Sequence, residues 1–195
     1  YPFVFDYFSS VMKNRNIIGN TEGYAWFLTK YGVNNGCGVF TAAQKKTFKE
    51  EAEKLGVLKT NVLAENIVLK DTSGVAQDLH KFASENDYTL LMFYAPTCDH
   101  CQKEVPEIDS TAAVIERIMN IKIGRFAVCN EPGLPKRTWT DFISRYKLTK
   151  NAIHVDLPAN SPIRSTYDAF ANPTFYLINR KAEVVVKKIS ALTKM

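Results

Sequence analysis

Hydrophobic positions follow a helical period in the first sixty residues. In FDYFSSVMKN and EGYAWFLTKYGV, apolar side chains recur every three or four positions, as on the buried face of an amphipathic helix. The breaker cluster NNGCG at 34–38 ends this pattern, and TAAQKKTFKEEAEKLGV predicts a further helix, with Thr41 as N-cap and Gln44 as its capping-box partner. Because short isolated helices are marginal in water, we expect residues 1–60 to form an N-terminal helical segment whose helices are packed.

From residue 61 to 195 the pattern changes to alternating strands and helices. Apolar runs predict strands in NIVLKDTSG, YTLLMFYA, IKIGRFAVC, NAIHVDL, NPTFYLIN and AEVVVKKI, and the last two, separated by RK, predict a hairpin. Helical spacing predicts helices in DLHKFAS, EVPEIDSTAAVIERIMN, RTWTDFISRYKL and SPIRSTYDAF. YTLLMFYA is nearly all apolar, as expected of a strand buried on both faces of its sheet. This order predicts an α/β domain in which helices cover a mixed sheet.

The stretch YAPTCDHCQKEVPE at 94–107 places two cysteines between the buried strand and the helix that follows it. A helix N-terminus offers unpaired N–H groups and the positive end of the helix dipole, and both stabilise a thiolate. The thiolate is the nucleophilic form of cysteine. We therefore predict that Cys98, at the more exposed position, is the nucleophile. Cys101, one turn further along, is predicted to be the resolving thiol that attacks a mixed disulfide.

Two other interpretations of the cysteine pair fit less well. A structural zinc site needs about four ligands, whereas Cys37 and Cys129 are single and distant. The three histidines, His80, His100 and His154, show no ligand spacing. A structural disulfide that closes so short a loop would add little stability. A redox-active dithiol is the preferred interpretation, and it requires neither a metal nor an organic cofactor.

Composition narrows the range of partners. Hydrophobic residues make up 46% of the 195-residue chain, which is enough for a core, and the formal net charge is +5. The lysines are scattered, so the basic stripe with exposed aromatic residues that is typical of nucleic-acid binding is missing. No apolar run approaches the roughly 18 residues that span a membrane. The chain begins at Tyr1, which suggests a mature or trimmed form and leaves room for a membrane tether outside this sequence.

From about Asn61 to its end the sequence resembles the thioredoxin-fold thiol-disulfide oxidoreductases of the TlpA/ResA type, in the form common in Bacteroidetes. The resemblance rests on LLMFYAPTCDHCQKEVPEI, in which Pro106 matches a helix-kinking proline, and on YDAFANPTFYLINRKAEVV. It implies a thioredoxin-like redox domain over 61–195, a cis Pro173 that faces the cysteines, and a location in a bacterial periplasm or cell envelope. The implied partners are protein thiols and disulfides, together with an electron donor or acceptor.

The resemblance also implies which residues contact the substrate. Tyr94 and Thr97 stand where thioredoxin carries tryptophans, which would reshape the surface around Cys98. Asn172 precedes Pro173 and replaces the threonine, serine or valine that the family usually has there. We therefore expect substrate contacts from Tyr94, Thr97, Asn172 and Pro173.

Asp99 and His100, between the cysteines, are expected to tune the redox potential. The pattern CxHC resembles that of the stronger oxidants of the DsbA and protein disulfide isomerase families. A donor or positive charge beside a thiolate stabilises it, whereas the negative charge of Asp99 opposes this effect. The hypothesis is a site more oxidising than that of thioredoxin. Met92 replaces the aspartate that thioredoxins bury, and Glu104 is interpreted as a surface residue of the helix.

Three classes of function remain open. The first is disulfide exchange with protein substrates. The second is a thiol peroxidase, since peroxiredoxins share the fold, although they resemble P-x-x-x-T-x-x-C whereas Pro96 here lies two residues before Cys98. The third is a non-catalytic module in which the helical front binds a partner and the cysteine pair only senses redox state or carries a metal.

Overall fold

The computed structural model describes residues 2–13, 20–34, 39–55 and 62–187. The chain divides into two compact units, Tyr1–Lys59 and Thr60–Met195. Each unit has a buried hydrophobic core of its own. Within the described residues, no helix combines the length and the apolar character needed to cross a membrane.

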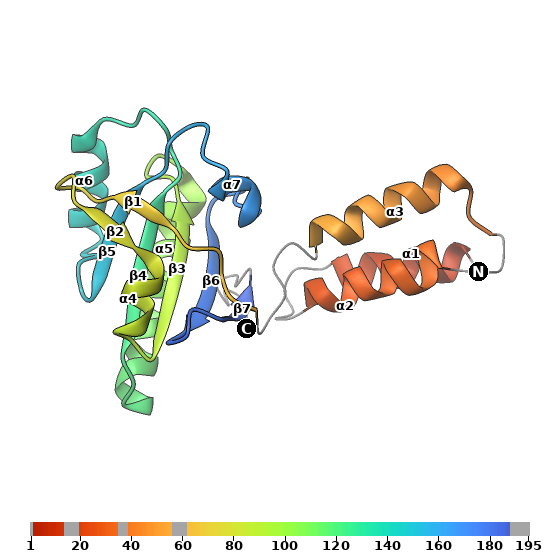
Figure 1. Cartoon of the computed structure of the whole chain (residues 1–195), viewed down its shortest axis with the longest axis horizontal. Coiled ribbons are helices and arrows are strands. Elements are labelled where there is room, and N and C mark those ends of the chain that lie inside the picture. Colours follow the sequence, from red (N-terminus) through yellow and green to blue (C-terminus); the bar gives the residue numbers. More distant parts are fainter. Residues whose placement is uncertain (1, 14–19, 35–38, 56–61, 188–195) are drawn as a thin grey trace. The chain divides into compact units, whose positions relative to one another are not determined.

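The described part of the first unit is helical, as the periodicity predicts. Helix α1 spans Pro2–Lys13, α2 spans Asn20–Phe27 and continues into a π-helical segment at Leu28–Val33, and α3 spans Ala42–Leu55 (Figure 1). The core between these helices is aromatic. The centroid of the Phe5 ring lies 5.0 Å from that of Phe27, 4.8 Å from that of Phe40 and 4.9 Å from that of Phe48.

Two local features position α3. The Thr41 N–H donates to Gln44 Oε1 at 2.9 Å and the Gln44 N–H donates to Thr41 Oγ1 at 3.2 Å, so the predicted capping box is confirmed. In the π-helical segment, Gly32 packs directly against Phe48. A Cβ atom at Gly32 would lie 2.8 Å from Cδ2 of the Phe48 ring, so a larger residue would force the segment and α3 apart.

The second unit is built on a five-stranded mixed sheet, and the predicted α/β, thioredoxin-like architecture is confirmed (Figure 1). Its strands are β3 (Tyr88–Tyr94), β4 (Ile123–Cys129), β5 (Ala152–Asp156), β6 (Thr174–Asn179) and β7 (Val184–Lys187), in the order β5-β4-β3-β6-β7. Strands β3, β4 and β5 are parallel, whereas β6 is antiparallel to β3 and β7 to β6. A separate hairpin pairs β1 (Val68–Lys70) with β2 (Ala76–Asp78), and β2 was not predicted.

Helices cover both faces of the sheet. They are α4 (Leu79–Ser84), α5 (Asp99–Met119), α6 (Lys136–Arg145) and α7 (Ile163–Thr166). Successive side chains of a strand point to opposite faces. Met92 of β3 therefore packs in a cluster with Ile108 of α5 and Phe142 of α6, while Phe93 faces the other way and contacts Tyr167, which follows α7, with ring centroids 5.3 Å apart. Both faces of β3 are buried, as its apolar sequence predicts.

The turn between the last two strands is longer than predicted. Strand β6 ends at Asn179 and β7 begins at Val184, so four residues, rather than Arg180 and Lys181 alone, form the turn. Ala182 takes the left-handed backbone region with φ 59°, and its N–H donates to the Asn179 carbonyl at 2.9 Å. This hydrogen bond closes the turn before Ala182 and delays the start of β7.

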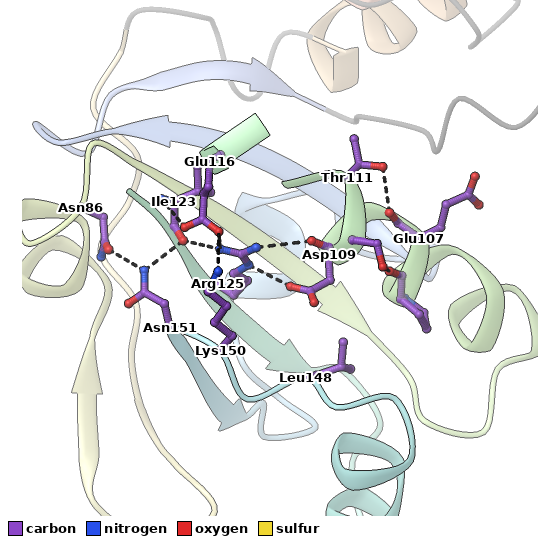
Figure 2. Close-up of polar contacts among 12 residues, drawn as sticks. Asn86, Glu107, Asp109, Thr111, Glu116, Ile123, Arg125, Leu148, Lys150 and Asn151 are labelled. Carbon is purple, nitrogen blue, oxygen red and sulfur yellow. Dashed lines mark hydrogen bonds and ion pairs between the residues drawn. The ribbon is translucent and has the colours of Figure 1, made fainter. Parts of the chain in front are cut away.

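A buried arginine ties helix α5 to the sheet. Arg125 of β4 is 1% exposed, and its guanidinium contacts Asp109 at 2.8 Å and Glu116 at 2.9 Å, both on α5 (Figure 2). Partial burial raises the pKa of Glu116, but the Ile123 N–H and the Arg125 guanidinium outweigh it, so that the pKa is lowered. Two carboxylates that lie two turns apart on one helix thus form ion pairs with the same cation in the sheet. These ion pairs fix the position of α5, the helix that begins at the cysteines.

Candidate active site

The two cysteines lie at the start of α5, as predicted. Cys98 is the N-cap residue, with φ −78° and ψ 123°, and its carbonyl accepts the first helical hydrogen bond, from Gln102 N–H at 3.0 Å. Cys98 is half-buried, whereas Cys101 is fully buried. The Ala95 N–H donates to Cys101 Sγ at 3.3 Å. The prediction that Cys98 is the more exposed sulfur is confirmed, and both side chains are thiols in this structure.

The loop before β6 lies against Cys98. The peptide bond between Asn172 and Pro173 is cis, as the resemblance implied, and Cys98 Sγ lies 3.7 Å from the Asn172 carbonyl oxygen. The strand register explains this proximity, because β3 and β6 pair Phe93 with Thr174. The residues after β3 and those before β6 therefore meet at one edge of the sheet.

Asn130, which the sequence analysis missed, holds this loop in place. It directly follows β4, is 8% exposed, and donates through Nδ2 to the Ala169 carbonyl at 2.7 Å and to Asn172 Oδ1 at 3.0 Å. Its own Oδ1 accepts from Arg164 Nε at 2.9 Å. A polar residue directly after an apolar run, at the carboxyl edge of a parallel strand, is the sequence signal that could have indicated it. The loop that faces Cys98 is thus fixed by side-chain contacts.

Glu131, also missed, fixes the residue before Cys98. The Thr97 N–H donates to Glu131 Oε2 at 3.1 Å and the Thr97 hydroxyl donates to Glu131 Oε1 at 2.6 Å. Thr97 is exposed, so it lies on the surface beside Cys98 as predicted. Both oxygens of one carboxylate thus order the backbone from which Cys98 projects.

Tyr94 does not lie on this surface, and its prediction as a substrate contact is wrong. The side chain is 0% exposed and points into the core. Its hydroxyl accepts from Trp139 Nε1 at 2.7 Å and donates to His154 Nδ1 at 2.9 Å, while His154 Nε2 donates to the Leu148 carbonyl at 2.6 Å. These proton positions follow from the partners, because an indole only donates and a carbonyl only accepts. A tyrosine is held inside because both its ring and its hydroxyl are satisfied there.

Burial sets the protonation of the groups behind Cys98. Burial raises the pKa of Cys101 far above that of a free thiol, the Ala95 N–H partly opposes this, and the Cys98 thiol and the charge of Glu104 add to it. Burial lowers the pKa of His154, which keeps the imidazole neutral. Cys101 therefore remains a protonated thiol while it is buried in this environment. A thiol that stays protonated until the mixed disulfide forms suits the role of a resolving residue.

Asp99 and His100 are exposed in the first turn of α5, and their role in tuning the redox potential stays a prediction. Cys129 is buried at the end of β4, and burial, with smaller contributions from nearby charges, raises its pKa to about 12. Cys37 lies outside the described residues. Across the described ranges, no three His, Cys, Asp or Glu side chains gather in a way that could hold a metal ion.

Sequence comparisons give limited matches. No known family profile matches the chain. Bovine protein disulfide-isomerase A4 is 24% identical over 120 residues, and mouse protein disulfide-isomerase A5 is 44% identical over 39 residues. These matches cover 60% and 20% of this chain but only 14% and 8% of those proteins. The chain thus corresponds to a small part of each of these curated relatives.

Solved structures match the fold over most of the chain. A thioredoxin-like protein from Bacteroides caccae has a TM-score of 0.68 at 21% identity, covering 88% of this chain and 59% of that one. A domain of a possible thiol-disulfide isomerase from Cytophaga hutchinsonii has a TM-score of 0.58 at 24% identity, with 69% and 86% covered. A thiol:disulfide interchange protein from Bacteroides sp. has a TM-score of 0.56 at 21% identity, with 69% and 84% covered. The chain therefore has the thioredoxin-like fold.

Proposed function

We propose that this protein is a thiol-disulfide oxidoreductase that exchanges disulfides with protein substrates. The observation that carries the proposal is the arrangement of two thiols at the start of one helix. Cys98 is accessible and faces a cis-proline loop, whereas Cys101 is buried one turn further on. An accessible thiol can form a bond with a partner protein, and a buried neighbour can then break that bond.

The reaction consists of two exchanges at sulfur. The Cys98 thiolate attacks one sulfur of a substrate disulfide, forms a mixed disulfide and releases the other substrate sulfur as a thiolate. Cys101 then loses its proton and attacks the Cys98 sulfur, which forms the Cys98–Cys101 disulfide and releases the second substrate thiol. The substrate gains two electrons and the enzyme loses two. In the reverse direction the enzyme disulfide oxidises a substrate dithiol by the same steps.

Three residues around Cys98 are proposed to receive the substrate. Asn172 and Pro173 belong to the loop that lies against the Cys98 sulfur. Thr97 directly precedes Cys98 in the sequence and is exposed. A polypeptide that brings a disulfide to Cys98 would contact this loop. Its fixed shape, held by Asn130, would reduce the loss of conformational freedom when the substrate binds.

The stoichiometry requires a second partner. Each reduction of a substrate leaves Cys98 and Cys101 oxidised, so an electron donor must restore the dithiol, and an acceptor is needed for the reverse direction. We propose that the reaction takes place in a bacterial cell envelope. Protein disulfides form and persist in such oxidising compartments and are rare in the cytosol.

Reduction of insulin disulfides in the presence of dithiothreitol tests the proposal. The wild-type chain should accelerate the reduction, Cys98→Ser should abolish the acceleration, and Cys101→Ser should slow turnover and accumulate a mixed disulfide that mass spectrometry detects. Cys129→Ser is the matched control, because that thiol is buried in the core away from the surface. A wild-type protein no faster than Cys98→Ser would refute the proposal. Consumption of a hydroperoxide instead would favour a thiol peroxidase.

A further inference from the structure

One large aromatic side chain near the candidate site is left in solvent. Phe170 is 66% exposed. Over the described residues 62–187, the other large hydrophobic side chains that are strongly exposed are aliphatic or methionine. Aromatic side chains, phenylalanine among them, are enriched where proteins bind one another. An exposed phenylalanine in the loop that precedes Pro173 therefore needs a physical explanation.

The loop geometry forces this ring outward. Ala169 is fully buried and its carbonyl is held by Asn130 Nδ2 at 2.7 Å, while Asn172 Oδ1 is held by the same nitrogen at 3.0 Å. With both ends drawn onto Asn130, the two residues between them form the outer side of the loop. Phe170 and Ala171 are both exposed accordingly. Phe170 is thus presented to solvent by a loop that polar contacts fix.

The ring lies within reach of the reacting sulfur. Phe170 precedes Asn172 by two residues, and two residues of chain span at most about 7 Å. The carbonyl of Asn172 lies 3.7 Å from Cys98 Sγ. A polypeptide that runs along this loop to bring its cysteine to Cys98 would therefore pass close to Phe170.

We propose that Phe170 selects the substrate by binding an apolar side chain that lies about two residues from the substrate's reacting cysteine. The proposal rests on the function proposed above and adds its substrate class: polypeptides with a hydrophobic residue near the cysteine. In an extended segment, residues two positions apart point to the same side and are separated by about 6.5 Å. This separation is close to the span of at most about 7 Å between Phe170 and Asn172, whose carbonyl oxygen lies 3.7 Å from Cys98 Sγ. Pairing two apolar side chains there removes both from water.

Reduction of matched peptide disulfides by the full chain provides the test. Two peptides would differ only at the position two residues from the cysteine, leucine in one and aspartate in the other, and oxidised glutathione would serve as a small substrate without such a residue. Wild type should reduce the leucine peptide on the order of tenfold faster than the aspartate peptide, the scale on which an apolar pocket discriminates. Phe170→Ser should lose most of this preference, and Phe170→Leu should retain much of it. Neither variant should change the rate with glutathione.

Ile118→Ala is the matched control. Ile118 is 74% exposed in the last turn of α5, about 28 Å along the helix from the cysteines at 1.5 Å per residue, and its loss should change neither rate. Equal rates for both peptides with wild type, or a preference that survives in Phe170→Ser, would overturn the inference while leaving the proposed function standing. Failure of wild type on both peptides and on glutathione would instead overturn the proposed function. Circular dichroism would confirm that the variants fold.

Discussion

Asp99 and His100 are the two residues that we predict to tune the redox potential of the cysteine pair. Both are exposed in the first turn of α5, directly after the candidate nucleophile. A group that stabilises the thiolate stabilises the reduced protein and makes the disulfide more oxidising, and a negative charge does the opposite. His100 and Asp99 are therefore expected to have opposite effects on the stability of the Cys98 thiolate.

Replacing His100 with alanine should make the protein more reducing. A loss of about 1.4 kcal/mol of thiolate stabilisation would lower the two-electron potential by about 30 mV. Asp99→Asn should shift the potential in the opposite direction. Equilibration in glutathione redox buffers, with the Cys98–Cys101 disulfide quantified by alkylation and mass spectrometry, measures both shifts. Equal potentials for wild type and both variants would show that neither residue tunes the site.

His154 makes stability depend on pH in the mildly acidic range. Burial lowers its pKa below the usual 6.5, so the folded protein binds fewer protons than the unfolded chain. The contribution of the neutral His154 side chain to the free energy of unfolding is fully present above pH 6.5. It is lost as the pH falls from 6.5 through the pKa that His154 has in the folded protein. The free energy of unfolding should therefore fall between pH 7.5 and pH 5. Urea unfolding at both pH values measures it.

His154→Gln is the informative comparison for this pH dependence, because an amide can replace both hydrogen bonds but does not titrate. Its free energy of unfolding should change less than that of wild type over the same interval. The carboxyl groups of Asp71 and Asp78 have lowered pKa values through hydrogen bonds, from Ser73 and from the Lys81 N–H respectively, so they lose their contribution only below about pH 4. A steeper fall in the variant than in wild type would contradict this role of His154.

At the scale of the elements, helix α5 connects the candidate site to a buried ion-pair network. Arg125 is 1% exposed and Glu116 11%, so neither charge can return to water without unfolding. Asp109 and Glu116 hold the same guanidinium from positions along one helix (Figure 2). The orientation of the helix, and with it the position of Cys98, depends on these contacts.

Arg125→Met should destabilise the protein by about 3–5 kcal/mol, because it removes the buried cation that contacts Asp109 and Glu116 and, within the described residues, leaves Glu116 only the exposed Lys150 as a cation, at 3.9 Å. Chemical unfolding measures the loss. A triple variant that also carries Asp109→Asn and Glu116→Gln should recover most of it, since no uncompensated charge then remains. If the single variant were as stable as wild type, the network would have no structural role.

Local patterns predicted most elements, and long-range contacts explain what was missed. The apolar run at 88–95 and the Thr41–Gln44 pair specify a strand and a helix start through neighbours in sequence, and both are confirmed. Asn130 and Glu131 acquire their roles only because the strand order brings three loops to one edge of the sheet. Tyr94 was misplaced for a related reason: its hydroxyl has partners on α6 and β5, which no local pattern reveals.

At the scale of the whole molecule, the chain contains two compact units with separate cores. We propose that residues 60–195 form the redox domain and that the helical unit is not needed for the chemistry. A polypeptide of residues 60–195 should fold and reduce oxidised glutathione at a rate close to that of the full chain, which circular dichroism and a thiol assay would show. Loss of the reaction in a folded fragment would give the helical unit a part in the chemistry.

The contact between Cys98 and Asn172 joins residues 74 positions apart. Cys98 precedes this loop in the sequence, so during synthesis the thiol emerges before the loop that is proposed to guide a partner to it. If this loop selects substrates as we propose, an incompletely folded chain carries an unselective thiol. Discrimination between substrates would then depend on the completed fold. A loss of discrimination would indicate damage to the sheet even while the Cys98 thiol still reacts.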